Sequence, residues 1–256
     1  MEKKVKKILL KELPFYLTWF KVKLMKIAIM QPTYLPWTGY FGLMEYVDKF
    51  ILLDNVQFSY QSWQHRNKIL TESGSIWLTV PCGKSNNKKL INEVDIKNNF
   101  FIKKHIKSIF QNYKKTLFFN TFSNDLFAVM NKKYDYLSEL NNNLILLIKN
   151  YLKIKTIIIK SSNLGVKKSS KDQYIFDICK SLNATTYVSP LGAENYLKNS
   201  DIFCKNKLSI EYFNFNHPIY KQINSKNFIS HLSIIDLIFN NGQESLHIIR
   251  SGLNSN

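Results

Sequence analysis

The stretch KIAIMQPTYLPWTGYFGLMEYVDKFILLDNVQ, residues 26–57, decides the fold class of this chain of 256 residues. Two strand-like runs, residues 27–30 and 48–54, flank a loop rich in proline and aromatic residues and a short helix-like segment at residues 41–46. Short runs that stay apolar on both faces are typical of strands in a buried parallel sheet. Strand, loop, helix and strand in succession form a βαβ unit, so we expect parallel strands joined by a right-handed crossover.

The alternation of strand-like and helix-like segments returns in the C-terminal half and predicts a mostly parallel, doubly wound, Rossmann-like α/β sheet. Strand patterns are found at residues 156–160, 185–189 and 208–215, and helix patterns at residues 171–182 and 232–239. Between the two halves, strand patterns occupy residues 75–81 and 90–96, and helical periodicity occupies residues 100–113 and 125–152. We therefore expect one α/β domain over residues 25–250 with a helical insertion at about residues 99–152.

Composition narrows the class of protein. A hydrophobic content of 45% is too high for a disordered chain, and no apolar run in the body of the chain is long enough to span a membrane. Cys82, Cys179 and Cys204 lie far apart and form no CxxC pair, which predicts neither a disulfide framework nor a metal site. We expect a protein of a reducing, cytoplasmic compartment.

The formal net charge of +18 raises the question of an anionic partner. Lysines are spread along the whole chain rather than clustered, as on an ordinary solvated surface, so the charge predicts no specific nucleic-acid partner. A nucleotide-phosphate substrate and an anionic membrane surface are the other two interpretations.

Residues 1–24 form an N-terminal extension with a basic start and an apolar stretch. Lys11, Glu12 and Lys21 interrupt the apolar run and no small-residue cleavage site follows, so the segment does not read as a secretory signal. It is either a mis-called start or an amphipathic arm that makes peripheral contact with a membrane.

The stretch at residues 27–69 also resembles the opening of the WbqC-like family, whose pattern is approximately QPxYLPWxGYF, then a strand ending LDxVQF, then WxxRNxI. The resemblance continues through WLTVP, KKHIKSIFQNYKK, LNATTYVSPLGAENYL, FNHPIY and HLSIIDLIFNNG, and covers nearly everything from Lys26 to Gly242. Met30 stands where the family often has His, and Pro190 where Gly is usual. The resemblance implies a role in assembling lipopolysaccharide O-antigen and related surface glycans, without supplying a reaction.

A first strand followed by a loop and a glycine at a helix start also resembles the nucleotidylyltransferase arrangement. There an HxGH motif contacts ATP phosphates with help from amides at a helix N-terminus. Trp37-Thr38-Gly39-Tyr40 occupies the place of HxGH, keeping the glycine and losing both histidines. Gly39 is equally explained by a tight turn that packs the helix on the sheet.

Two groups of polar and aromatic residues follow the first two strands. Tyr34, Trp37 and Tyr40 would form a wall that stacks on a sugar or a base, or else a core cluster. Asp54, at the carboxyl end of the second strand, would bind a ribose hydroxyl, a magnesium ion or a substrate amine, or else cap a turn. Arg66 is one of very few arginines, which suggests a fork-shaped ligand for an anion or carboxylate, or a structural salt bridge.

The loops at the carboxyl ends of neighbouring parallel strands should converge on one crevice: residues 31–40, 54–57 and 189–193, with Arg66 pointing into it. We expect catalytic roles for Arg66, Asp54 and His217, with His217 as the general base. The predicted substrate-binding residues are Gln31, Tyr34, Trp37, Gly39, Tyr40, Asn55, Gln57, Trp63, Asn67, Ser189 and Gly192.

The leading hypothesis is an enzyme of surface-glycan biosynthesis that transfers or ligates an acyl or aminoacyl group onto a nucleotide-linked amino sugar. If the nucleotidylyltransferase likeness holds, the reaction is ATP-dependent amide formation through an acyl adenylate, with ATP and Mg²⁺ as cofactors. The alternative is a non-catalytic sugar-nucleotide-binding or scaffold protein of the same pathway. No serine-hydrolase, P-loop or zinc-protease motif is present.

Deleting residues 1–24 should leave the melting temperature nearly unchanged, because the pattern of the predicted domain is complete from Met25 onward. Thermal unfolding of the full and shortened chains measures this. A large drop in melting temperature, or loss of solubility, would show that the extension packs on the core.

Overall fold

The computed structural model describes residues 24–193, 197, 201–223 and 225–253. The N-terminal extension, residues 1–24, lies outside the described residues apart from Leu24. Within the described residues, no helix combines the length and the apolar character needed to cross a bilayer.

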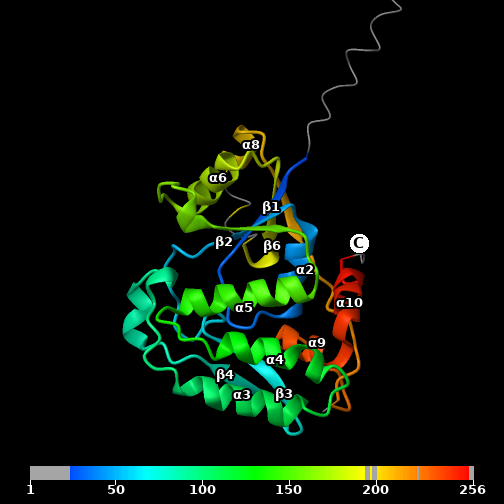
Figure 1. The fold of residues 1–256 in the computed structure, drawn as a ribbon. Helices are drawn as coiled ribbons and strands as arrows, with labels where there is room; N and C mark the ends of the chain where they lie inside the picture. Colours follow the sequence, from blue (N-terminus) through cyan, green and yellow to red (C-terminus); the bar gives the residue numbers. More distant parts are fainter. Residues whose placement is uncertain (1–23, 194–196, 198–200, 224, 254–256) are drawn as a thin grey trace, which may run out of the picture.

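A five-stranded sheet forms the centre of the fold, and all its neighbouring strands pair in parallel. Its strands, in chain order, are β1 (Lys26–Met30), β2 (Lys49–Leu52), β5 (Ile157–Lys160), β6 (Thr186–Pro190) and β7 (Ser209–Phe213). The spatial order β5-β2-β1-β6-β7 places the first strand in the middle (Figure 1). The chain therefore winds outward from β1 in both directions, which confirms the predicted mostly parallel, Rossmann-like α/β sheet.

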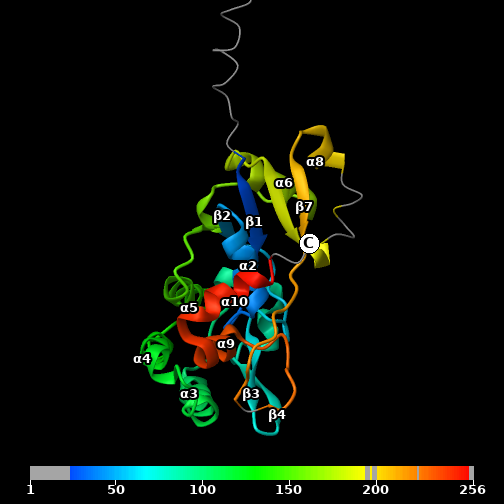
Figure 2. The same ribbon diagram turned by 90° about the vertical axis from the view of Figure 1, so that its right-hand side faces the viewer.

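Helices cover both faces of this sheet. Ala28 of β1 packs with α2 (Thr38–Tyr46) in one hydrophobic core. Ile27 and Ile29 point to the other face and pack with α6 (Lys171–Ser181) in a second core. The short helix α8 (Asp201–Lys205) lies beside α6 on that face (Figure 2). Burial on both faces is the physical reason why β1 is apolar at consecutive positions.

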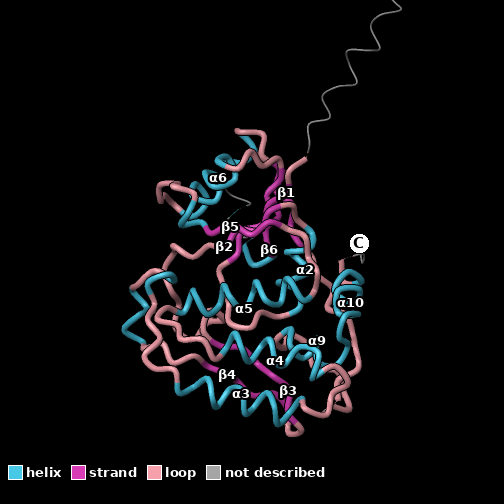
Figure 3. The backbone as a smooth tube through the Cα atoms, in the orientation of Figure 1, coloured by secondary structure: helices cyan, strands magenta, loops and turns pink. Residues whose placement is uncertain are grey.

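The chain between β2 and β5 leaves the sheet and builds a second layer, shown in Figure 3 as helices and one hairpin joined by loops. The hairpin pairs β3 (Arg66–Thr71) with β4 (Gly74–Thr79) antiparallel. Three helices follow: α3 (Phe100–Tyr113), α4 (Phe119–Met130) and α5 (Leu137–Tyr151). These helices lie where the helical insertion was expected, but the segment outside the sheet also includes the hairpin that precedes them.

Five short 3-10 helices and two C-terminal helices complete the described elements. The 3-10 helices are η1 (Lys84–Lys88), η2 (Ile91–Glu93), η3 (Ser161–Asn163), η4 (Leu191–Ala193) and η5 (Gly242–Glu244). After β7 the chain returns to the second layer, where α9 (Ile234–Asn241) packs on α4 and β3, and α10 (Ser245–Ser251) packs on α2. Arg250 of α10 donates from Nε to Glu45 of α2 at 2.8 Å.

Two local predictions are wrong. The strand expected at residues 90–96 is a 3-10 turn flanked by isolated bridges, Gln57 with Leu90 and Asp95 with Tyr136. The alternating apolar residues there are buried individually, without a neighbouring strand. The helix expected at residues 125–152 is two helices, because Tyr134 turns into the core after α4 and its hydroxyl donates to the Val129 carbonyl.

The buried carboxylate of Asp236 joins α9 to the second layer. It accepts hydrogen bonds from the Tyr113 hydroxyl (2.9 Å), the Tyr220 hydroxyl (2.8 Å) and the Gln222 amide (2.8 Å). Burial raises the pKa of Asp236, and these three neutral donors offset part of that effect. The side chain is fully enclosed, so its role is to hold the layer together.

His105 joins α3 to the loop after β1. Although lysines neighbour it in the sequence, its side chain is buried and its Nδ1 lies 2.9 Å from the Tyr34 hydroxyl. Burial lowers the pKa of His105 to about 4, and a hydrogen bond to the Thr79 backbone offsets this only in part. The imidazole is therefore neutral near pH 7 and belongs to the core.

Lowering the pH from about 6.5 toward 4 should destabilise the protein. In this pH range His105 becomes protonated in the unfolded chain, whereas in the folded protein it stays neutral. In the His105→Gln variant, the free energy of unfolding should fall by on the order of 2–3 kcal/mol less over this pH range. At neutral pH the substitution itself lowers the free energy of unfolding. Urea unfolding at several pH values measures the slope. His247→Gln, at an exposed position of α10, is the control. Equal slopes in both variants would contradict the assignment.

Candidate functional site

The candidate site is a crevice at the carboxyl ends of β1, β2 and β6. After β1 the chain passes to β2 on one side, and after β6 it passes to β7 on the other. Connections that leave in opposite directions open a crevice between them, and this switch point is where open α/β sheets bind ligands. The structure therefore has its crevice at the edge that the sequence indicated.

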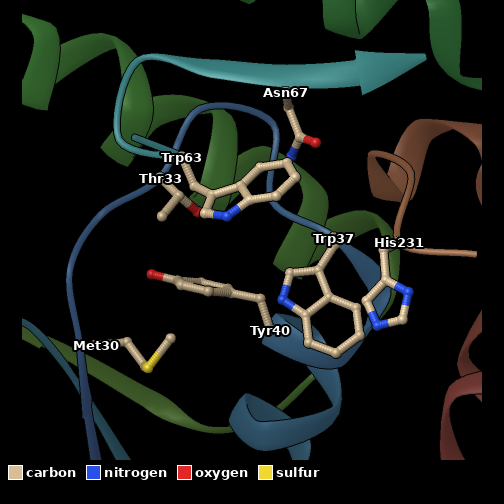
Figure 4. A pocket seen from close by; sticks show the side chains of 7 residues that line it. All are labelled: Met30, Thr33, Trp37, Tyr40, Trp63, Asn67 and His231. Carbon is tan, nitrogen blue, oxygen red and sulfur yellow. The ribbon is translucent and has the colours of Figure 1, made fainter. Parts of the chain in front are cut away.

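Three adjoining pockets make up the crevice. The aromatic compartment is lined by Met30, Thr33, Trp37, Tyr40, Trp63, Asn67 and His231 (Figure 4). The central compartment is lined by Ile29, Met30, Gln31, Thr33, Leu53, Ser62, Trp63, Gln64, Ile175, Tyr187 and Pro190. The polar compartment is lined by Gln31, Leu53, Val56, Gln57, Phe58, Ser59, Asn87, Lys171, Tyr174 and Ile175. The aromatic, central and polar compartments measure about 280, 300 and 520 Å³, and together they leave room for a nucleotide-sized ligand.

Trp37 forms one wall of the aromatic compartment and is held in a stack of rings. Its indole lies parallel to the His231 ring at 4.9 Å and to the His217 ring at 6.0 Å, with the Phe215 ring edge-on at 5.7 Å. The indole also folds over the start of α2, where a Cβ on Gly39 would come within 2.2 Å of it. Gly39 is thus required for close packing under Trp37.

The two histidines that stack on this indole are His217 and His231. The His217 Nδ1 donates to the Pro218 carbonyl at 3.0 Å, so its Nε2 is an acceptor, and this atom is buried without a hydrogen-bond partner. Burial and the nearby His231 lower the pKa of His217, although hydrogen bonds to backbone groups oppose the shift. His231 is exposed, lines the compartment, and adopts a left-handed φ of 59°. Of the pair, His231 is the one that faces the crevice.

The two tyrosines of the loop have different positions. Tyr40 lines the aromatic compartment, and its hydroxyl donates to the Gln31 carbonyl at 3.3 Å. Tyr34 is fully buried against His105 and is not among the lining residues. Trp63 is about half exposed, lines two compartments, and contacts Trp77 at a ring distance of 5.2 Å.

Asp54 and Asn55 are bonded within the protein. The Asp54 carboxylate accepts from the Ser161 hydroxyl (3.0 Å), the Ser162 backbone amide (3.0 Å) and the Ser162 hydroxyl (2.7 Å). Asn55 exchanges hydrogen bonds with the Tyr174 hydroxyl and accepts from Ser161. Both side chains therefore fix η3 against the end of β2 and lie outside the three linings. Gln57 does line the polar compartment, where its amide donates to the Asn87 carbonyl at 2.8 Å.

Asn67 and Arg66, neighbours on β3, point to opposite faces of the hairpin. The Asn67 amide donates to the Leu35 carbonyl (2.6 Å) and its oxygen accepts from the Lys68 amide (2.7 Å), so it borders the crevice with its polar atoms engaged. The Arg66 guanidinium lies 4.4 Å from the centre of the Trp77 ring. Its Nε is buried without a hydrogen-bond partner, and Arg66 is not among the lining residues.

The loop after β6 contributes Pro190 to the central compartment. Ser189 is fully buried and its hydroxyl donates to the Pro190 carbonyl at 3.2 Å. Gly192 lies in η4 with open space around its Cα. Neither Ser189 nor Gly192 is among the lining residues.

Several lining residues carried no sequence signal. Gln64 is buried, accepts from the Ser59 amide (3.0 Å) and donates to the Gln31 side chain (2.8 Å). Lys171 and Tyr174 begin α6, far along the chain, and reach the polar compartment only through the topology of the sheet. His231 lies in the loop before α9. Only its position two residues before the Ser233 cap of α9 could have marked it as a loop residue.

The lining of the crevice combines rings, amides and hydroxyls with the basic residue Lys171 and a histidine, and it contains no carboxylate. Such a surface suits a polar ligand with a flat ring and a neutral or negative charge. Mg²⁺ is held mainly by carboxylate oxygens and substrate phosphates, so these side chains do not form a magnesium site. The described residues also contain no group of three His, Cys, Asp or Glu side chains placed to hold a metal ion.

Fold and site together define a Rossmann-like α/β protein with a ring-lined crevice at its switch point. The model of the WbqC-like protein family matches residues 31–248, and the chain belongs to that family. It is 32% identical over 228 residues to "Uncharacterized protein Rv1507c" of Mycobacterium tuberculosis (strain ATCC 25618 / H37Rv), covering 88% of this chain and 97% of that protein. No solved structure matches the chain.

Gly39→Ala should lower the free energy of unfolding by about 1–3 kcal/mol, because the added Cβ forces the Trp37 indole to move. Gly192→Ala is the matched control, since a Cβ there meets nothing within 4 Å. Urea unfolding measures the difference, and tryptophan fluorescence reports the displaced indole. Equal, small effects in both variants would show that the indole is not packed on Gly39.

Proposed function

We propose that the crevice binds a nucleotide-linked amino sugar of a surface-glycan pathway and that the protein attaches an acyl or aminoacyl group to the sugar amine. The observation that carries this proposal is the lining of the switch-point crevice, which joins an aromatic compartment to a polar one without a carboxylate. Membership of the WbqC-like family supports the glycan context, because the family's name suggests a role in O-antigen assembly.

The side chains that line the crevice match the chemical groups of this ligand. Trp63 offers a flat face to a base or sugar ring, and stacking of this kind tolerates different rings. The amides of Gln31 and Gln57 suit sugar and ribose hydroxyls. Lys171 at the far end supplies positive charge for a phosphate. A carboxylate in the lining would repel the diphosphate of such a ligand, so its absence favours this class.

Amide formation requires a group that accepts a proton. The neutral sugar amine attacks the acyl carbonyl, the new C–N bond forms, and the bond from the acyl carbon to its leaving group breaks with the electron pair leaving on that group. When the acyl donor is a carboxylic acid that has reacted with ATP to give an acyl adenylate and pyrophosphate, the leaving group in this step is AMP. The proton lost by the amine passes to His231, the histidine that lines the compartment. No step is assigned to Mg²⁺.

A non-catalytic sugar-nucleotide-binding protein is the second candidate. It is favoured by the internal hydrogen bonds of Asp54, Asn55 and Asn67, which leave few free polar groups for chemistry. This candidate predicts the same ligand in the same crevice without turnover.

Trp63→Ala should weaken binding of a uridine-diphosphate-linked amino sugar about 10- to 100-fold, because a stacking face is lost. Trp77→Ala is a closely matched control, since Trp77 is similarly exposed and contacts Trp63 but does not line the crevice. Isothermal titration calorimetry measures both. Absence of binding to the unsubstituted protein, or equal losses in the two variants, would contradict the proposed site.

Turnover distinguishes the two candidates. The protein with ATP, glycine and the same amino sugar should release AMP and give a heavier sugar. His231→Gln should slow this reaction about 100-fold while the Kd changes little, and exposed His247→Gln should leave both unchanged. Tight binding with no AMP for any acid tested would assign the protein to the binding class.

A further inference from the structure

Helix α3 presents an outward face that is basic and apolar at once. Phe100, Lys103, Lys104 and Lys107 recur at helical spacing on this face, and all four are exposed. Phe110 and Lys114 continue the same stripe. The opposite side of the helix, with Phe101, Ile102, His105, Ile109 and Tyr113, is buried in the core.

The apolar side chains on this face are unusually free of protein contacts. Phe100 is 78% exposed, and Leu117, just beyond the helix, is 83% exposed. Phe110 is 46% exposed, with its ring edge against Phe119. Burying large apolar groups of this kind is favourable wherever an apolar phase is available, and water does not provide one.

The charge on the same face is of one sign. The sequence has no acidic residue between Asp95 and Asp125, whereas it has six lysines there, including all those of α3. Among the described residues, Lys103, Lys104 and Lys107 form no ion pair. The remaining charge of the chain is more mixed, so the even spread of lysine along the sequence does not explain this face.

We propose that the α3 face, defined as Phe100, Lys103, Lys104, Lys107, Phe110, Lys114 and Leu117, docks on an anionic phospholipid membrane surface. Lysines attract acidic headgroups, and the aromatic and aliphatic side chains among them insert at the boundary of headgroups and acyl chains. Nucleic acid would satisfy the lysines but leaves exposed Phe100 and Leu117 unexplained. The inference rests on α3 alone and is independent of the proposed crevice ligand.

The position of α3 makes the face available to a planar partner. α3 lies at the end of the molecule opposite α6 and α8, with the hairpin beside it (Figures 1 and 2). A groove lined by Trp77, Phe100 and Lys104 runs between β4 and α3 and extends the same mixed surface onto the hairpin. Trp77 is 41% exposed there, and tryptophan is a residue favoured at membrane interfaces.

Vesicle co-sedimentation with the full chain tests the charge. The protein should bind vesicles of phosphatidylcholine with about one third phosphatidylglycerol, and bind pure phosphatidylcholine far less. Replacing Lys103, Lys104 and Lys107 together with Gln should weaken binding up to about 100-fold. The matched control replaces exposed Lys167, Lys168 and Lys180 of the α6 region with Gln, removing the same charge at the other end of the molecule. Equal losses in the two triple variants would overturn the proposal.

A second pair of variants tests insertion. Phe100→Ser with Leu117→Ser should lower vesicle binding about tenfold, including at high salt, because apolar burial is not screened. Ile219→Ser with Leu191→Ser, both exposed and outside this face, should have little effect. If the Ser variants bind vesicles normally while the lysine triple variant loses affinity for a nucleic-acid duplex, the partner is nucleic acid and the membrane proposal fails. Melting temperatures confirm that all four variants remain folded.

Discussion

The hydrogen bonds that tie the loop after β1 to the second layer are the constraint on which the crevice depends. The Asn141 amide on α5 donates to the Gln64 carbonyl at 2.8 Å and to the Pro32 carbonyl at 3.3 Å, so one buried side chain joins both loops. The Tyr34 amide donates to the Trp63 carbonyl at 3.1 Å. Each of these groups would be buried and unpaired if the loops separated, which costs about 1–3 kcal/mol apiece. The distance between Trp37 and Trp63 is therefore set by α5 and the hairpin as much as by the sheet.

The architecture of the sheet could be predicted from the sequence because its signals are local. Residues 27–30 and 50–53 are apolar at consecutive positions, and only burial on both faces requires that. The second layer is harder to predict from the sequence. The strand Arg66–Thr71 begins with charged and polar residues, since Arg66 and Lys68 lie on a face formed with Trp77. Periodicity cannot reveal such a strand, because its stabilising contacts come from the partner strand.

The position of the crevice could be predicted from the sequence, but the side chains that line it were harder to predict. Topology alone brings residues 31–40 and Pro190 to one edge, and the crevice lies there. Whether a polar side chain at that edge meets a ligand or another protein group depends on residues far away. Asp54 shows this: its partner Ser161 is 107 positions distant, so the sequence could not distinguish a ligand-binding carboxylate from a structural one. Arg66 likewise has its aromatic partner on β4, a contact that scarcity of arginine did not indicate.

The start of α2 shows what shapes one end of the crevice. A helix N-terminus beside a glycine can bind a phosphate when the backbone amides are open to it. Here the Trp37 indole folds over Gly39 at the start of α2 and is held by the His231 and His217 rings. An indole in this position replaces an anion-binding surface with an apolar one. If the crevice binds the proposed sugar nucleotide, Lys171 in the polar compartment is the basic residue for its phosphates, and the ligand would lie with its ring toward Trp63 and its anionic part toward α6.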